Sequence, residues 1–145
     1  MLNQIMIIAL SVCAVYSQSN ESFSLDEYRW KNRIIIINNG PDKLTSDRQK
    51  QLLLKDIAGL QERHLLIFEI GQDLIRDILN EKNYEIHQNL LDKLDLNSGA
   101  YEILLIGKDG GVKLRSSVPV TDNEIYNLID QMPMRQVEMQ KQKLR

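Results

Sequence analysis

Runs of apolar residues separated by polar turns predict four strands along the chain. Residues 33–38 contain four consecutive isoleucines, which is typical of a central strand covered on both faces. Residues 64–70 (HLLIFEI) and 101–106 (YEILLI) predict two more buried strands. Residues 112–116 alternate apolar and basic side chains and predict a fourth strand. The glycine-rich turn 107–111 joins the last two strands as a hairpin.

Helical spacing separates the first three strands. The first predicted helix begins at Thr45 or Ser46, either of which can cap it, and Gly59 can end it. Its apolar residues are leucine or isoleucine at 53, 57 and 60. The region 72–97 is less regular. Its apolar residues indicate one or two helical turns around 74–79 and a clearer helix at 85–94.

A capping box begins the last predicted helix. Thr121 can accept a hydrogen bond from the amide three residues on, and Glu124 can reach back to the amide of Thr121. Apolar residues at 125, 128, 129 and 132 then lie on one face. Pro133 stops or kinks this helix, and residues 134–145 are expected to form a basic C-terminal tail.

The first 17 residues are interpreted as a signal peptide. Residues 5–15 are apolar, but this run is shorter than the about 20 residues that span a membrane. Cleavage after Ser17 would leave Gln18 as the new N-terminus, followed by a flexible lead-in over 18–27. The alternatives are a buried N-terminal strand and lipidation at Cys13, for which Val12 is a poor preceding residue.

The element order β-α-β-α-β-β-α indicates an α/β fold over residues 28–133. Strands joined by helices are expected to be parallel, through right-handed crossovers, and the hairpin strands antiparallel. This order is the core of the thioredoxin-like fold, a three-layer sandwich around a mixed four-stranded sheet. A ferredoxin-like fold is the main alternative, but it requires the order β-α-β-β-α-β.

Charge and cysteine content exclude several functions. The 145 residues carry a formal charge of −2, which argues against a general nucleic-acid binder. The single cysteine excludes an internal disulfide, a CxxC motif and a cysteine-rich zinc site, and His64 and His87 have no evident third ligand. Thioredoxin-like enzymes carry their reactive cysteine just after the first strand, where residues 39–46 contain none. A thiol oxidoreductase is therefore not expected, a thiol peroxidase is the weakest alternative, and no cofactor or metal is expected.

Three motifs together resemble a known family. They are residues 28–33 (YRWKNR), residues 104–115 (LLIGKDGGVKLR), and residues 132–135 (MPMR) with the pair Glu138-Met139. The chain resembles, over roughly 25–140, a secreted family of unknown function related to a domain of vertebrate sushi-repeat-containing matrix proteins. This resemblance implies export and a thioredoxin-like or peroxiredoxin-like fold without redox cysteines. It implies no particular activity.

Polar residues within these motifs are the candidate binding residues. They are Arg29, Trp30, Arg33, Lys108, Lys113, Arg115 and Arg135. The basic side chains suit a carboxylate or phosphate, although those on an edge strand can simply be solvated. Trp30 can stack an arginine or cover the end of the core. The glycine-rich turn can form a small anion site or a plain hairpin, and the methionines 132, 134 and 139 an adaptable surface.

The leading hypothesis is an exported, non-catalytic binding module, either periplasmic or extracellular. Its partner would be a protein or an envelope component, with no nucleic acid and no membrane-spanning segment. The alternative is an enzyme of non-thiol chemistry that uses Arg115, Arg135 and a carboxylate. That alternative requires these residues to converge in one concave pocket.

Overall fold

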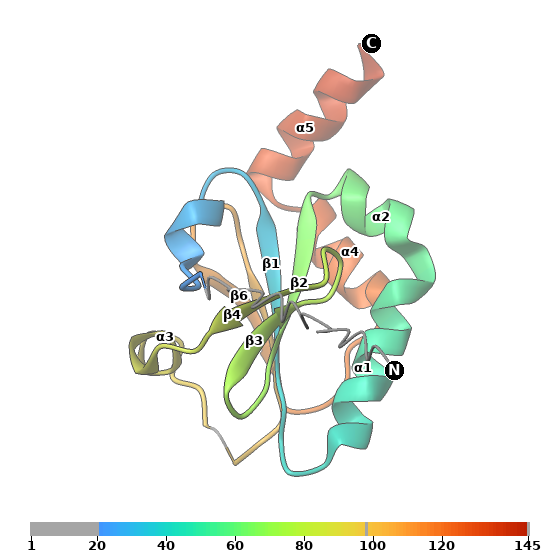
Figure 1. Cartoon of the computed structure of the whole chain (residues 1–145). Helices are drawn as coiled ribbons and strands as arrows, with labels where there is room; N and C mark the ends of the chain where they lie inside the picture. Colours follow the sequence, from blue (N-terminus) through green and yellow to red (C-terminus); the bar gives the residue numbers. More distant parts are fainter. Residues whose placement is uncertain (1–20, 98, 145) are drawn as a thin grey trace, which may run out of the picture.

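The structure, a computed structural model, describes residues 21–97 and 99–144, so the interpreted signal peptide lies outside the described residues (Figure 1). This part of the chain is an α/β fold with a mixed sheet, as the sequence predicts. Its elements, with η for a 3₁₀ helix, are η1 (Leu25–Tyr28), β1 (Arg33–Asn38), α1 (Lys43–Leu53), η2 (Leu54–Asp56), α2 (Ile57–Glu62), β2 (Leu65–Ile70), β3 (Leu74–Asp77), β4 (Lys82–Glu85), α3 (Gln88–Lys93), β5 (Glu102–Ile106), β6 (Val112–Ser116), α4 (Asp122–Asp130) and α5 (Pro133–Lys143).

The described part of the chain forms one six-stranded sheet in the order β4-β3-β2-β1-β5-β6. Strands β1 and β2 are parallel, and every other neighbouring pair is antiparallel. The expected sheet had four strands, so that expectation is corrected: β3 and β4 extend the sheet beyond β2.

The isoleucine run is buried because β1 lies in the middle of a three-layer structure. Its side chains alternate between two cores. Ile35 and Ile37 pack under the layer that contains α1, α2 and α4, whereas Ile34 and Ile36 pack under η1 and α3. Figure 1 shows these two helical layers on opposite sides of the sheet.

The hairpin β3–β4 occupies the region in which helical turns were expected at 74–79. Residues 74–77 alternate between exposed and buried positions, which is the strand period of two rather than a helical one. The carboxylate of Asp77 then accepts hydrogen bonds from the backbone amides of Leu79 and Asn80 and from the Asn80 side chain. These bonds fix the turn that reverses the chain. The helix expected at 85–94 is shorter and spans only α3.

The helix expected from 45 to 59 is divided into two. Asp42, rather than Thr45 or Ser46, caps α1 by accepting a hydrogen bond from the Leu44 amide at 3.0 Å. The tighter 3₁₀ turn of η2 then changes the helical phase, so that Ile57 is exposed. Gly59 lies within α2 instead of ending it. The absence of a side chain there is required by close neighbours, since a Cβ would meet the Asp56 carboxylate and the Tyr126 ring.

Both ends of the domain depart from the expected flexible segments. The capping box of Thr121 and Glu124 begins α4 as predicted. Pro133 does not end the structure; it lies in the first turn of α5, where its lack of an N–H is tolerated. The segment expected as a tail therefore forms a helix that extends beyond the body of the molecule (Figure 1).

The described part of the lead-in is also packed rather than flexible. Phe23 is 5% exposed, and its ring contacts those of Tyr28, Phe68 and Tyr84 at centroid distances of 4.7–5.8 Å. Such aromatic clusters stabilise by area burial and by ring geometry. Residues 21–28 are consequently part of the domain.

Replacing Phe23 by alanine should lower the free energy of unfolding by about 3 kcal/mol, because a large buried side chain is lost and a cavity remains. Urea unfolding of the purified domain measures the change. Leu44→Ala is the matched control, since Leu44 is 77% exposed. Equal stability of both variants would show that the lead-in does not contribute to the core.

Candidate functional site

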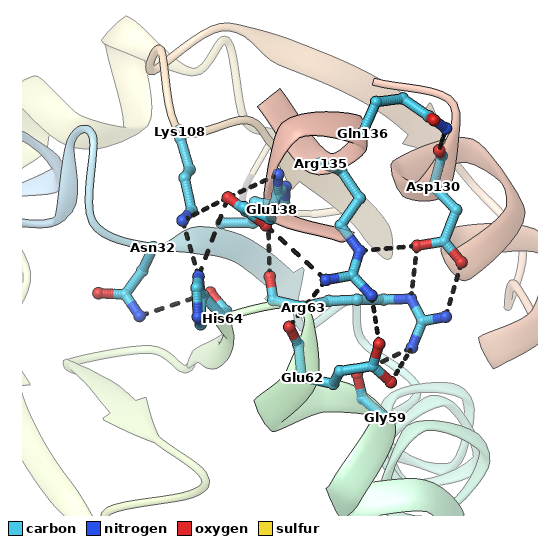
Figure 2. Close-up of polar contacts among 11 residues, drawn as sticks. Asn32, Gly59, Glu62, Arg63, His64, Lys108, Asp130, Arg135, Gln136 and Glu138 are labelled. Atoms are coloured by element: carbon cyan, nitrogen blue, oxygen red, sulfur yellow. Dashed lines mark hydrogen bonds and ion pairs between the residues drawn. The ribbon is translucent and has the colours of Figure 1, made fainter. Parts of the chain in front are cut away.

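The three sequence motifs converge at the amino end of β1. Arg33 is the first residue of β1, and Lys108 follows β5 in the hairpin. Since β1 and β5 are antiparallel with Ile34 opposite Ile106, the start of β1 lies beside the turn that carries Lys108. Helix α5 brings Arg135 and Glu138 to the same place (Figure 2). We call this the charged cluster; its members are Arg33, Glu62, Arg63, His64, Lys108, Asp130, Arg135 and Glu138.

Glu138 lies at the centre of the charged cluster. Its Oε2 is 3.0 Å from Arg33 Nη1, and its Oε1 is 2.7 Å from Lys108 Nζ. Arg135 Nη1 approaches the same carboxylate at 3.9 Å. Burial would raise the pKa of Glu138, but the hydrogen bonds from Arg33 and Lys108 outweigh it and hold that pKa below its ordinary value. Glu138 is therefore a carboxylate shared by three cations.

His64 extends the cluster toward solvent. Its Nδ1 lies 2.7 Å from Lys108 Nζ. Burial, together with the positive charge of Lys108, lowers the pKa of His64, so its ring is neutral near pH 7. Lysine only donates hydrogen bonds, so Nδ1 accepts and the ring proton lies on Nε2. His64 also has a left-handed backbone (φ 51°), which packed surroundings must support in a residue other than glycine.

Arg135 organises the second half of the charged cluster. It is fully buried, and its Nε donates to Asp130 at 3.0 Å while its Nη1 donates to the Glu62 carbonyl at 3.1 Å. Arg63 binds the same Asp130 carboxylate with two of its nitrogens, at 3.0 and 2.6 Å. The Arg63 guanidinium also lies 4.1 Å from the centre of the Tyr126 ring. These contacts connect the start of α5 to the ends of α2 and α4.

The glycine-rich turn is a plain hairpin in this structure. Gly110 has a φ of 84°, which favours glycine. The amide of Gly110 donates to the Gly107 carbonyl and that of Gly111 to the Asp109 carboxylate. Because these amides already donate within the turn, they do not form the small anion site that the sequence left open.

Arg29 and Trp30 lie on the outer side of this hairpin. The Trp30 amide donates to the Lys108 carbonyl at 2.7 Å, and Arg29 Nε donates to the Asp109 carbonyl at 3.0 Å. The Trp30 ring is 61% exposed, with the Arg29 guanidinium 5.7 Å from its centre. Trp30 also has a left-handed backbone (φ 66°). It is therefore a fixed, exposed aromatic residue and does not cover the core.

The candidate residue Arg115 lies apart from the others. Its guanidinium binds the Glu102 carboxylate and the carbonyls of Leu94 and Asp95, which connects β6 to the end of α3. Within the described residues, Arg115 and Arg135 have no hydrogen-bond or ion-pair partner in common, so these two arginines do not converge as the enzyme alternative requires. Lys113, on the same strand, pairs with Asp109 at 2.7 Å near the hairpin.

Sequence reasoning found Arg33, Lys108 and Arg135 of the charged cluster but missed Arg63 and most of the carboxylate partners. Glu138 was part of a motif, whereas Glu62, Arg63 and Asp130 were not singled out. The one available signal was that buried arginines require carboxylates. The sequence cannot say which carboxylates the fold brings near.

A separate hollow of about 590 Å³ lies at the opposite, carboxyl end of β1 and β2. Asn39, Pro41, Lys43, Ile70, Gln72 and Leu91 are among the residues that line it. Beneath it, the buried Glu69 accepts hydrogen bonds from Lys50 at 2.7 Å and from Asn39 at 3.1 Å. Residues 39–46, where a thiol enzyme of the expected fold would carry its cysteine, border this hollow.

Among the described residues, 21–97 and 99–144, no group of three or more His, Cys, Asp and Glu side chains is arranged to hold a metal ion. Within the same residues, no helix has the length and apolar character needed to cross a membrane.

Comparison with known proteins agrees with the motif resemblance. A family described as a domain of unknown function (DUF4174) matches residues 24–138. The chain belongs to this family. The DUF4174 match contains all three motifs apart from Met139, and it contains the complete charged cluster. No solved structure gives a significant match.

Curated relatives contain a similar stretch within longer chains. The sushi repeat-containing protein SRPX2 of Bos taurus and that of Homo sapiens are each 27% identical over 111 residues, and that of Xenopus laevis is 25% identical over 114 residues. The match covers 73% of this chain but only 24% of each of these relatives. The DUF4174 chain thus spans about a quarter of the length of these proteins.

Replacing Glu138 by glutamine should reduce the free energy of unfolding at pH 7 by about 2 kcal/mol, between the values for surface and fully buried ion pairs. Because the pKa of Glu138 is depressed in the folded state, its contribution is complete above the ordinary glutamate pKa and is lost as pH falls through the folded value. The difference between wild type and variant should therefore shrink on acidification.

Urea unfolding at a series of pH values measures this difference. Glu27→Gln, an exposed glutamate in η1, is the control for loss of one negative charge. A Glu138→Gln variant as stable as wild type at pH 7, or a difference independent of pH, would contradict a central ionised carboxylate.

Proposed function

We propose that this chain is an exported, thioredoxin-like interaction module that binds a partner protein without thiol chemistry. The observation that carries the proposal is the surface at the amino end of β1. There a buried charged cluster supports the exposed side chains of Arg29, Trp30, Lys113 and Met134. Tryptophan, arginine and methionine are enriched at protein interfaces, and tryptophan and arginine are among the residues that dominate their binding energy.

The strand arrangement supports the thioredoxin-like part of the proposal. Within the larger sheet, β2-β1-β5-β6 contains a parallel pair joined by helices, followed by an antiparallel strand and a hairpin partner. Helices cover both faces of these four strands. The hairpin β3–β4 is then an addition at the β2 edge.

The carboxyl end of β1 supports the absence of thiol chemistry. A helix N-terminus there would stabilise a cysteine thiolate. In this chain Asp42 is the N-cap residue of α1, and its carboxylate accepts a hydrogen bond from the amide of Leu44. Among the described residues that line the hollow beside it, the side chains are amide, ammonium and apolar, with no thiol or hydroxyl group.

Trp30 is well suited to anchor a partner. Its main-chain bond to Lys108 holds the backbone from which the ring projects. Tryptophan has only two side-chain torsions, so ordering its ring on binding costs little conformational entropy. Met134 (39% exposed) lies on the other side of the hairpin, beside Lys108 and Lys113, so apolar contacts flank a basic centre.

Export has a direct test. Expression of the full chain in its native host should give a mature protein whose N-terminus is Gln18, because Val15 and Ser17 are small enough for the two positions that signal peptidase reads. N-terminal sequencing of the protein outside the cytoplasm identifies the start. An intact Met1 in the exported protein, or a lipidated start at Cys13, would contradict this prediction.

Partner binding is tested by crosslinked pull-down with the mature protein. Trp30→Gly should lose the captured partner without loss of stability, since glycine accepts the left-handed backbone at this position. Mass spectrometry of the captured protein and urea unfolding of each variant give the two readouts.

Leu44→Ala serves as the control for this pull-down, because Leu44 is exposed on α1 at the other end of the sheet. Unchanged capture by Trp30→Gly, or loss of capture by Leu44→Ala instead, would contradict the proposed surface. Peroxide turnover by mature protein that lacks Cys13 would contradict a non-catalytic interaction module.

A further inference from the structure

A small hollow beside the charged cluster has the character of a receptor for an acidic side chain. It measures about 140 Å³ and lies between the hairpin and the start of α5. Arg33, Lys108 and Lys113 supply its positive charge, and Met132, Pro133 and Met134 supply its apolar wall. This volume is well below the range of about 300–1,000 Å³ for cofactor or drug-sized ligands. It is suited to a single side chain.

One hydrogen-bond donor at this hollow is unused. Arg33 is 1% exposed, and its two Nη atoms bind Glu138 and the Arg63 carbonyl. Its Nε is buried and has no hydrogen-bond partner among the described residues. Leaving a buried N–H unpaired costs about 1–3 kcal/mol. An acceptor brought by a ligand would recover that energy.

The local charge also favours an anion. Three cations line the hollow, Arg33, Lys108 and Lys113, whereas only two carboxylates, Glu138 and Asp109, pair with them. At the rim, Asp109 pairs with Lys113, but both side chains are more than 30% exposed. Exposed pairs of this kind contribute about 0–1 kcal/mol. An incoming carboxylate can therefore replace Asp109 as the partner of Lys113.

We infer that this hollow binds the aliphatic carboxylate of a glutamate side chain on the partner protein. The methylene groups would contact Met132, Pro133 and Met134, and the carboxylate would meet Lys113, Lys108 and the Nε–H of Arg33. The inference rests on the proposed function in taking the carboxylate from a partner protein. It adds the chemical identity of the group that is recognised.

The Nε–H signal of Arg33 in ¹H–¹⁵N NMR spectra tests the hollow without any partner. The blocked peptide Ac-Ala-Glu-Ala-NH₂ should shift this signal in a saturable manner, whereas Ac-Ala-Gln-Ala-NH₂ should not. Lys113→Gln should weaken the binding of the glutamate peptide about fivefold, the upper end for a partly exposed ion pair. Arg115→Gln removes the same charge from the same strand, away from the hollow, and should leave binding unchanged.

Further probes separate the sources of the anion. The affinity of propionate should be no higher than that of the glutamate peptide. Binding of propionate without binding of the peptide would overturn the assignment to a protein side chain. Tighter binding of inorganic phosphate than of the peptide would overturn the carboxylate. No shift with either acid, or equal effects of Lys113→Gln and Arg115→Gln, would overturn the site itself. These results do not depend on the pull-down, so failure of one proposal is distinguishable from failure of the other.

Discussion

The carboxylate of Glu138 is the constraint on which the amino end of the sheet depends. Arg33 and Lys108 are 1% and 8% exposed, and buried cations are tolerated only when paired and hydrogen-bonded. Glu138 pairs with both, and it comes from α5, the last helix. Displacing α5 would leave two buried cations without their counter-charge. The C-terminal helix is therefore held to the domain by charge rather than by an apolar face.

The same pairing positions residues that make no contact with Glu138 at hydrogen-bond distance. Lys108 donates to the His64 ring, and its carbonyl accepts the Trp30 amide. Both His64 and Trp30 have left-handed backbones, which cost roughly 1–3 kcal/mol in residues other than glycine and persist only where surrounding contacts enforce them. The charged cluster thus helps to hold the backbone conformation from which the exposed tryptophan projects.

The sequence predicted those parts of the fold whose signals are local. The strands β1, β2, β5 and β6 are apolar runs bounded by turn residues, and the capping box of α4 lies within four residues. The hairpin β3–β4 was missed because short apolar runs do not distinguish a strand from a helical turn, and Asp77 fixes the reversal through its side chain. Helix α5 was missed because its buried residue is Arg135, and hydropathy assigns arginine to the surface.

The candidate site was predictable only as a set of motifs, because ion pairing between distant segments cannot be read from spacing. The structure divides the motif residues by burial. Arg33, Lys108 and Arg135 form the frame, whereas Trp30 and Lys113 face solvent. Substitutions of the buried residues would affect stability and binding together, whereas substitutions of the exposed residues would affect binding alone. Because Arg33, Lys108 and Lys113 outnumber their partners Glu138 and Asp109, the local charge beside the hairpin is positive although the chain carries a net charge of −2. This local field, rather than the net charge, selects the chemistry of a partner.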